Sequence, residues 1–174
     1  DWFRIGLSVQ TPTRYNVSDA WSANMFTGTD DGLKYVSEEN VPYGSYDYRV
    51  TTPMRANVSF GLIYKKLGSF GLDVEYVDYS TASLSSKKYA DAPYLFTSEN
   101  AQIDNIYRPA FNLKAGAEYR LSGQIYLRGG YANYASPFRM DKGNPIYNTH
   151  LITAGFGYNL GDFYFDLAGM LRKN

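Results

Sequence analysis

The sequence predicts an all-β protein, an antiparallel transmembrane β-barrel segment with about eight strands in residues 1–174. Three observations favour this fold class. Apolar and polar residues alternate over long stretches, these stretches are longer than most strands of soluble sheets, and short turns alternate with long polar loops. The 18 tyrosines and 10 phenylalanines fit the strand assignment, because aromatic residues are enriched in strands.

The clearest alternation runs over residues 111–120. Phe111, Leu113 and Tyr119 are in phase with each other, and Lys114 and Glu118 are in the opposite phase. Successive side chains of a strand point to opposite faces, so this strand has one apolar and one charged face. Residues 54–64 repeat the pattern.

Eight stretches are predicted to be strands. They are residues 2–10, 15–26, 52–65, 70–79, 109–121, 124–134, 149–160 and 163–171. Most are close to the roughly 9 to 11 residues that a tilted strand needs to cross a bilayer, whereas strands of globular sheets contain about 5 to 6. No apolar run approaches the roughly 18 residues of a membrane-spanning helix.

The connections are of two kinds. Residues 66–69, 122–123 and 161–162 are predicted hairpin turns with glycine at positions of positive φ. Residues 28–51, 80–108 and 135–148 are predicted long loops. Outer-membrane barrels combine short periplasmic turns with longer extracellular loops, and structureless loops longer than about 12 to 15 residues are uncommon in compact soluble domains.

The charged phase of the strands is predicted to line the lumen, since Arg or Lys facing lipid costs about 2 to 4 kcal/mol at the bilayer midplane. The lumen-lining candidates are Arg55, Asn57, Asp73, Glu75, Lys114, Glu118, Arg120, Arg128 and Asp166. We expect Asp73 and Glu75 to pair with Arg55, and Glu118 to pair with Lys114, Arg120 or Arg128. Glycines of the same phase indicate either a ligand channel or, as we favour, the close approach of a plug or bulky neighbours: Gly116, Gly130, Gly155 and Gly157.

The apolar phase is predicted to face lipid. The lipid-facing candidates are Phe60, Leu72, Leu113, Leu127, Phe156 and Phe165. Aromatic residues near strand ends fit the girdles found at membrane interfaces. These residues are Trp2, Tyr15, Trp21, Tyr64, Tyr79, Tyr107, Tyr119, Tyr134 and Tyr158.

Four segments resemble the FadL/TodX family of outer-membrane transporters for hydrophobic compounds, in particular its Bacteroidetes-type members. They are YDYRVTTPMRANVSFG at 46–61, GLDVEYVDYS at 71–80, LKAGAEYR at 113–120 and LRGGYANYASPF at 127–138. The resemblance covers most of the chain but only the C-terminal part of the family's barrel. It implies a barrel of 14 strands, an N-terminal hatch in the lumen, and passive uptake of long-chain fatty acids or aromatic hydrocarbons through a lateral opening. The hatch and further strands have no counterpart in residues 1–174.

Other classes of function find little support. The net charge is zero, which argues against nucleic acid as a partner, and there is no cysteine. A single histidine, His150, and the absence of a Gly-x-Ser-x-Gly motif favour a protein that is not an enzyme, with no catalytic residues, no metal and no cofactor. A calcium site at Asp30, Asp31, Glu38 and Glu39 is an alternative to solvated loop charge, but these residues lack the ligand spacing of a calcium loop.

The predicted function is therefore a channel of the bacterial outer membrane for passive uptake of hydrophobic small molecules, with membrane lipid and an apolar ligand as partners. A non-transport barrel serving as a scaffold, adhesion or secretion partner is one alternative. A soluble lipocalin-like carrier is another, and it would place Phe111, Leu113, Tyr119, Ile152 and Phe156 inside.

The strand directions also predict the size of the whole barrel. If the short turns are periplasmic, residues 163–171 end on the outer side, and the same count makes residues 2–10 run inward. Bacterial barrels normally have an even strand number. We therefore expect further strands before Asp1 and after Asn174, ten or more in all, and pairing of this segment with those strands or with another copy.

Overall fold

The computed structural model describes residues 2–23, 26–29, 32–35, 43–86, 94–139 and 147–174. Within these ranges the chain is mostly antiparallel strand, with one α-helix and one 3-10 turn. The all-β antiparallel fold class is confirmed. No described helix is long and apolar enough to cross a membrane.

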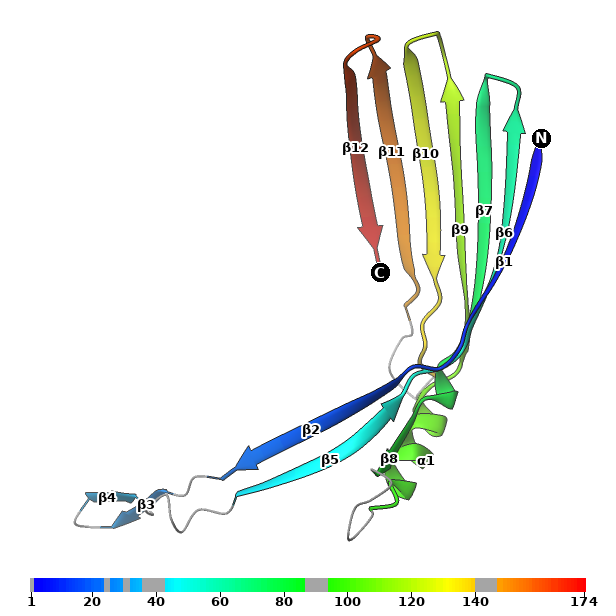
Figure 1. Ribbon diagram of the computed structural model, residues 1–174. Coiled ribbons are helices and arrows are strands. Elements are labelled where there is room, and N and C mark those ends of the chain that lie inside the picture. The colour runs from blue at the N-terminus through cyan, green and yellow to red at the C-terminus, as the bar shows by residue number, and fades with distance from the viewer. Residues whose placement is uncertain (1, 24–25, 30–31, 36–42, 87–93, 140–146) are drawn as a thin grey trace.

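The largest element is a curved seven-stranded sheet (Figure 1). Its strand order is β1-β6-β7-β9-β10-β11-β12, and every neighbouring pair is antiparallel. The strands are β1 (Phe3–Gln10), β6 (Arg55–Tyr64), β7 (Gly68–Asp78), β9 (Pro109–Arg120), β10 (Ile125–Tyr134), β11 (Thr149–Asn159) and β12 (Tyr164–Lys173). The sheet is not closed, since β1 and β12 are its two edges.

Three short turns join β6 to β7, β9 to β10 and β11 to β12 at one end of the sheet, which we call the short-turn end (Figure 1). Gly161 has a φ of 86°, as expected for a hairpin glycine, but Lys65 takes the left-handed conformation in the first turn with a φ of 51°. Gly68, which was expected to do so, lies in β7, where a Cβ would collide with the carbonyl oxygen of Glu118. This glycine is therefore required by strand packing.

A second sheet leaves the opposite end, which we call the long-loop end. Its order is β2-β5-β8, formed by β2 (Arg14–Ser22), β5 (Tyr43–Thr51) and β8 (Ser83–Ser86). Beyond it lies the hairpin of β3 (Phe26–Thr29) and β4 (Gly32–Tyr35). The strands β2 and β5 form an arm that projects from the seven-stranded sheet, which we call the barrel sheet (Figure 1).

The arm corrects two predictions. Residues 15–26 were expected in the barrel, but β2 pairs along its whole length with β5, a strand inside the predicted loop 28–51. As a result, seven rather than eight of the predicted strands share the large sheet. Counting β2 as a barrel strand also gave β1 the wrong direction, because β1 is antiparallel to β6 and runs away from the short-turn end. The predicted direction of β1 is thus wrong, whereas β12 does run toward the long-loop end, as predicted.

The predicted loop 80–108 contains a folded unit made of the 3-10 turn η2 (Tyr79–Thr81), β8 and helix α1 (Thr97–Ile106). Asn100 of α1 accepts a hydrogen bond from the backbone N–H of Leu84 at 2.8 Å and donates one to its carbonyl at 2.9 Å. The amide thus binds the free edge of β8 as a neighbouring strand would. Phe96, which is buried, precedes the helix and packs against Tyr46, Tyr48 and Tyr94 with ring centroids 4.9–6.0 Å away.

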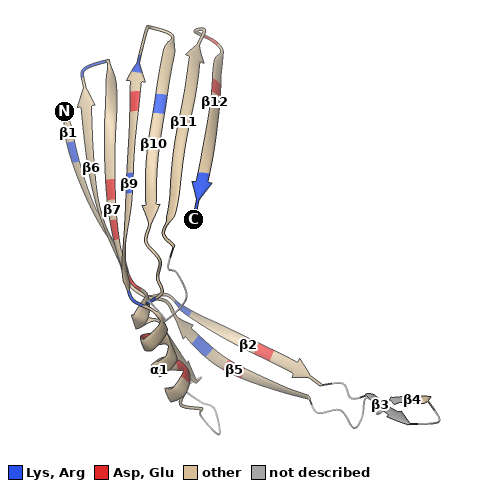
Figure 2. Ribbon diagram, turned by 180° about the vertical axis from the view of Figure 1, so that it is seen from behind, with Lys and Arg blue, Asp and Glu red and all other residues tan. Residues whose placement is uncertain are grey.

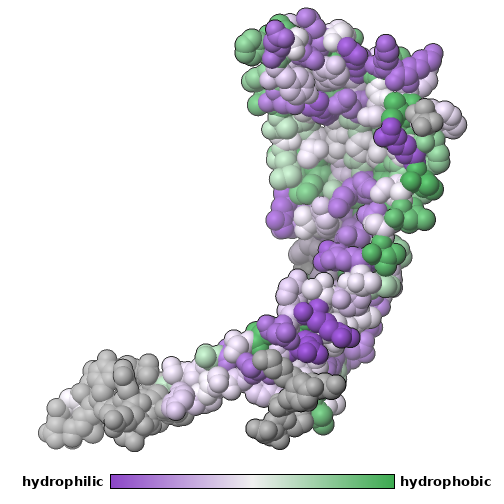
Figure 3. Space-filling model, viewed as in Figure 1, coloured by the Kyte–Doolittle hydropathy of each residue, from purple (hydrophilic) through white to green (hydrophobic). Residues whose placement is uncertain are grey.

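The described part of the chain has almost no hydrophobic core. Val77, Phe96 and Ala110 are the only hydrophobic residues buried there. The seven-stranded sheet is a single layer, so many of its large apolar side chains remain exposed. In Figure 3, hydrophobic residues gather along the β1 edge of this sheet, whereas hydrophilic and intermediate residues cover much of its visible face.

Candidate functional site: the two faces of the barrel sheet

The register of the strands divides the sheet into a charged face and an apolar face. Residues directly opposite each other on antiparallel strands share a face. The pairs Asn57–Glu75, Asp73–Lys114 and Glu118–Arg128 therefore belong to one face. The same reasoning places all nine lumen-lining candidates on this face, and Figure 2 shows charged positions on β7, β9, β10 and β12.

The charged face is the concave one. A hollow of about 660 Å³ lies against β7, β9, β10, β11 and β12 and is lined in part by Asp73, Lys114, Glu118, Arg128 and Asp166. A lipocalin-like carrier would need the apolar side chains on the concave side. The observed curvature does not fit that alternative.

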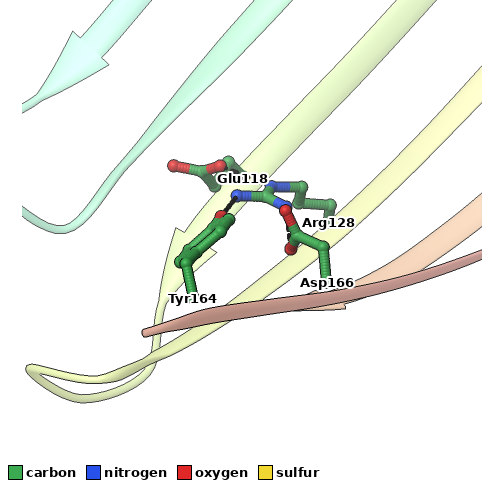
Figure 4. A network of polar contacts seen from close by, with 4 residues as sticks. All are labelled: Glu118, Arg128, Tyr164 and Asp166. Atoms are coloured by element: carbon green, nitrogen blue, oxygen red, sulfur yellow. Dashed lines mark hydrogen bonds and ion pairs between the residues drawn. The ribbon is translucent and has the colours of Figure 1, made fainter. Parts of the chain in front are cut away.

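Arg128 is the centre of a polar cluster on this face (Figure 4). Its guanidinium donates from Nε to Glu118 at 2.6 Å, from Nη1 to Asp166 at 2.5 Å and from Nη2 to the Tyr164 hydroxyl at 2.6 Å. One cation thus binds two carboxylates and joins β9, β10 and β12. Of the three partners expected for Glu118, the structure selects Arg128.

Glycines of β11 make this cluster possible. Arg128 is on β10 and Asp166 on β12, so the side chain must cross β11, where Gly155 and Gly157 lie opposite these two residues. A Cβ on Gly157 would be 2.7 Å from the Asp166 carboxylate, and one on Gly155 would be 3.5 Å from Cβ of Arg128. Gly155 and Gly157 therefore leave room for large side chains, as expected. These side chains belong to the adjacent strands β10 and β12 of the same sheet.

The partners expected for Asp73 and Glu75 are wrong. The Ser59 hydroxyl donates to Asp73 at 2.5 Å, and the Asn112 amide donates to Glu75 at 2.8 Å. Arg55 lies opposite Val77 at the long-loop end, and within the described residues it forms no ion pair with either carboxylate.

Two further cations on this face contact aromatic rings. Lys114 lies 5.5 Å from the ring centre of Tyr134, and Arg120 lies 5.4 Å from that of Tyr126. Arg120 also donates to two carbonyls of its own turn, which explains why it is not the partner of Glu118. Tyr134 was expected in an aromatic girdle but belongs to the charged face.

Asn112 is a buried polar residue that the pattern did not single out. Only 5% of it is exposed, and its amide donates to Glu75 on β7 and accepts from the backbone N–H of Ala135 at 3.1 Å. The alternation indicates only that Asn112 belongs to the polar face. Its two hydrogen bonds fasten β7 and the end of β10 to β9.

The six lipid-facing candidates all lie on the apolar face. Leu113, Leu127, Phe156 and Phe165 are each more than a third exposed. Tyr64, Tyr119 and Tyr158 join them on this face at the short-turn end, as expected for one aromatic girdle.

Other predicted girdle residues lie elsewhere. Tyr15 and Trp21 are on the arm, while Tyr79 and Tyr107 belong to η2 and to the end of α1. The aromatic residues that the apolar face does carry near the long-loop end are Tyr76 and Phe111, with ring centroids 5.0 Å apart, and Tyr131.

No site of metal chemistry emerges in the part of the chain that the structure describes. It contains no group of three or more His, Cys, Asp and Glu side chains placed to hold a metal ion. The alternative calcium ligands Asp30, Asp31, Glu38 and Glu39 lie outside the described residues.

Comparison with known proteins supports the fold. No family model and no curated protein matches the chain. Among solved structures, a FadL homologue of Pseudomonas aeruginosa matches 98% of the chain with a TM-score of 0.64 and 14% identity. A deltaS2S3 mutant of the monoaromatic hydrocarbon channel TodX matches 97% of it with a TM-score of 0.53 and 14% identity. The chain spans 40% of the length of each. The predicted resemblance is thus confirmed at the level of the fold: the chain has the fold of part of a FadL/TodX-type barrel.

Proposed function

We propose that this chain forms part of a channel in the bacterial outer membrane for passive uptake of hydrophobic small molecules, such as long-chain fatty acids or aromatic hydrocarbons. The observation that carries the proposal is a one-layer curved sheet with an uncovered apolar face on one side and a polar face of balanced charge on its concave side. A solved structure with a similar fold belongs to a monoaromatic hydrocarbon channel. The function of that structural neighbour is consistent with the proposed uptake of hydrophobic compounds.

The apolar face supports a location in lipid. On β9 it runs from Phe111 to Tyr119, which is ~27 Å along the strand at about 3.4 Å per residue. At the ~40° tilt of such strands it corresponds to ~21 Å of height, close to a lipid-facing band about 25 Å tall between two aromatic girdles. Burying a Leu or Phe side chain contributes about 1.5 to 3 kcal/mol, so the six candidates together would contribute on the order of 10 kcal/mol if lipid covered them.

The concave face supports passage of an uncharged solute. The lumen-lining candidates contain four cationic and four anionic side chains, so their formal charges cancel. Arg128 has two carboxylate partners, and a wall in which both signs of charge are balanced produces a weaker field than a wall of one sign. Such a lumen has no strong preference for anions or cations.

The experiment is an uptake assay in bacterial cells that carry or lack the intact gene. We expect a labelled long-chain fatty acid or toluene to enter faster in cells with the protein, and a small sugar to enter at the same rate in both. Protein that assembles in the outer membrane without changing either rate would contradict transport. That outcome would favour the non-transport alternative, which the projecting arm with exposed Trp21 and Tyr43 also fits.

A further inference from the structure

Polar side chains replace apolar ones on the apolar face at the long-loop end of β10, β11 and β12. Asn133, His150 and Lys173 lie directly opposite one another on the three strands and therefore share this face. The side chains just below them in the same phase are Tyr131, Ile152 and Leu171. Basic residues thus replace apolar ones where the proposed lipid-facing band ends.

Tyr131 orients the imidazole of His150. Its hydroxyl lies 2.8 Å from Nδ1, and the two rings are nearly parallel with centroids 6.1 Å apart. With the hydroxyl donating to Nδ1, the neutral ring carries its proton on Nε2 and can donate it to another group. The hydrogen bond leaves Nε2 available beside Lys173.

Among the residues that the structure describes, Lys173 has no acidic partner on this face. Within the described residues no carboxylate forms an ion pair with Lys173 or His150. An ammonium group on a lipid-facing surface is stable where its stem reaches the headgroup region. There its natural counter-charge is the phosphate of a lipid.

We propose that Lys173 and His150, with Tyr131 as the positioning residue, form a binding site for the phosphate of an anionic lipid headgroup in the outer leaflet. The inference rests on the proposed function, since it places the long-loop end at the outer surface of the membrane. Lys173 supplies charge and Nε2 of His150 supplies a directed hydrogen bond. The acyl chains of the lipid would lie along the apolar face, over Ile152 and Leu171, which are 58% and 75% exposed.

Arg172 provides a matched control. It precedes Lys173 and carries the same charge, but it lies opposite Leu151 on the charged face, where Nε donates to Asn174 at 3.3 Å. Neutralising either residue therefore removes one positive charge from the same end of β12. Only one of the two changes affects the face proposed to contact lipid.

The test is lipid binding by the intact protein in a neutral detergent, measured by native mass spectrometry with diphosphorylated lipid A as the probe and phosphatidylcholine as the neutral lipid. We expect Lys173→Gln to weaken binding of lipid A about fivefold, the scale of one basic residue at an anionic surface. Arg172→Gln should leave it unchanged, and phosphatidylcholine should respond to neither. Equal effects of both changes, or no effect of Lys173→Gln, would overturn the site.

Two further arms separate the possible explanations. Inorganic phosphate that competes fully with lipid A would show that the site binds free phosphate, and the lipid assignment would be wrong. The Lys173→Gln protein should still assemble and take up solute at the normal rate. Lost lipid selectivity with normal uptake contradicts only this inference, whereas lack of uptake by the unmodified protein contradicts the proposed function.

Discussion

Leu167 and Met170 offer a direct test of which face of the sheet meets lipid. Both residues lie on β12 and both are 64% exposed, but Leu167 lies opposite Phe156 on the apolar face and Met170 opposite Thr153 on the charged face. By exposure alone, a change to arginine should have the same effect at both positions. If lipid covers one face and water the other, the effects should differ greatly.

The expected difference follows from the depth of Leu167. It is three residues from the start of β12, which is ~10 Å along the strand. It therefore lies inside a band about 25 Å tall but not at its centre, and arginine there should cost about 2 kcal/mol, between the values for interface and midplane. This corresponds to about a 30-fold change in the folding equilibrium. Met170→Arg should change stability by no more than about 0.5 kcal/mol, as for an ordinary surface substitution.

The assay is reversible unfolding of the intact protein in phospholipid vesicles by guanidinium, followed by tryptophan fluorescence and by far-UV circular dichroism. Both variants are compared with the unmodified protein under the same conditions. If the two free energies of unfolding agree within about 0.5 kcal/mol, the apolar face does not meet lipid and the reasoning is refuted.

Three other predictions concern individual contacts. Gly157→Ala should destabilise the protein by up to about 1 kcal/mol, because its Cβ would displace the Asp166 carboxylate from its half-exposed ion pair with Arg128. Gly169→Ala, with nothing within 4 Å of the new Cβ, should be close to neutral in the same unfolding measurement. Asn100→Ala should remove both hydrogen bonds to the edge of β8, a loss of about 1 to 3 kcal/mol. Hydrogen exchange of the β8 amides should then be about 5- to 150-fold faster. Unchanged exchange would contradict this role of the Asn100 amide. The hydrogen bond that Tyr94 donates to the Glu99 carboxylate, together with the negative charge of Glu99, raises the pKa of Tyr94 above 10.0. Its stabilising effect should be complete below pH 10.0 and lost as the pH rises through the higher pKa of the folded protein, and an NMR titration should show the pKa falling toward 10.0 in Glu99→Gln.

The face of each barrel strand could be predicted from the sequence because it depends on a local property. Leu113 and Lys114 are neighbours in the chain, and any extended backbone sends them to opposite sides. The same period of two assigns Leu127 and Arg128 to opposite faces, whatever strands lie beside them. The nine lumen-lining candidates thus share one face of the sheet and the six lipid-facing candidates share the other.

Which strands pair with each other could not be predicted from the alternation, because strand pairing depends on residues far apart in the chain. The alternation in residues 15–22 fits a barrel strand as well as an arm, and only the pairing of β2 with β5 decides between them. Because β2 is therefore not a strand of the large sheet, the predicted direction of β1 is reversed. The contact of the β8 edge with Asn100 likewise joins residues far apart in the chain.

The ion pairs show the same division. The sequence determined that Glu118, Arg128 and Asp166 share a face, since each follows the alternation of its own strand. Only the tertiary structure decided that Arg128 crosses β11 to reach Asp166. The physical reason is that this contact requires the register of three strands and the missing side chains of Gly155 and Gly157, which no single strand specifies.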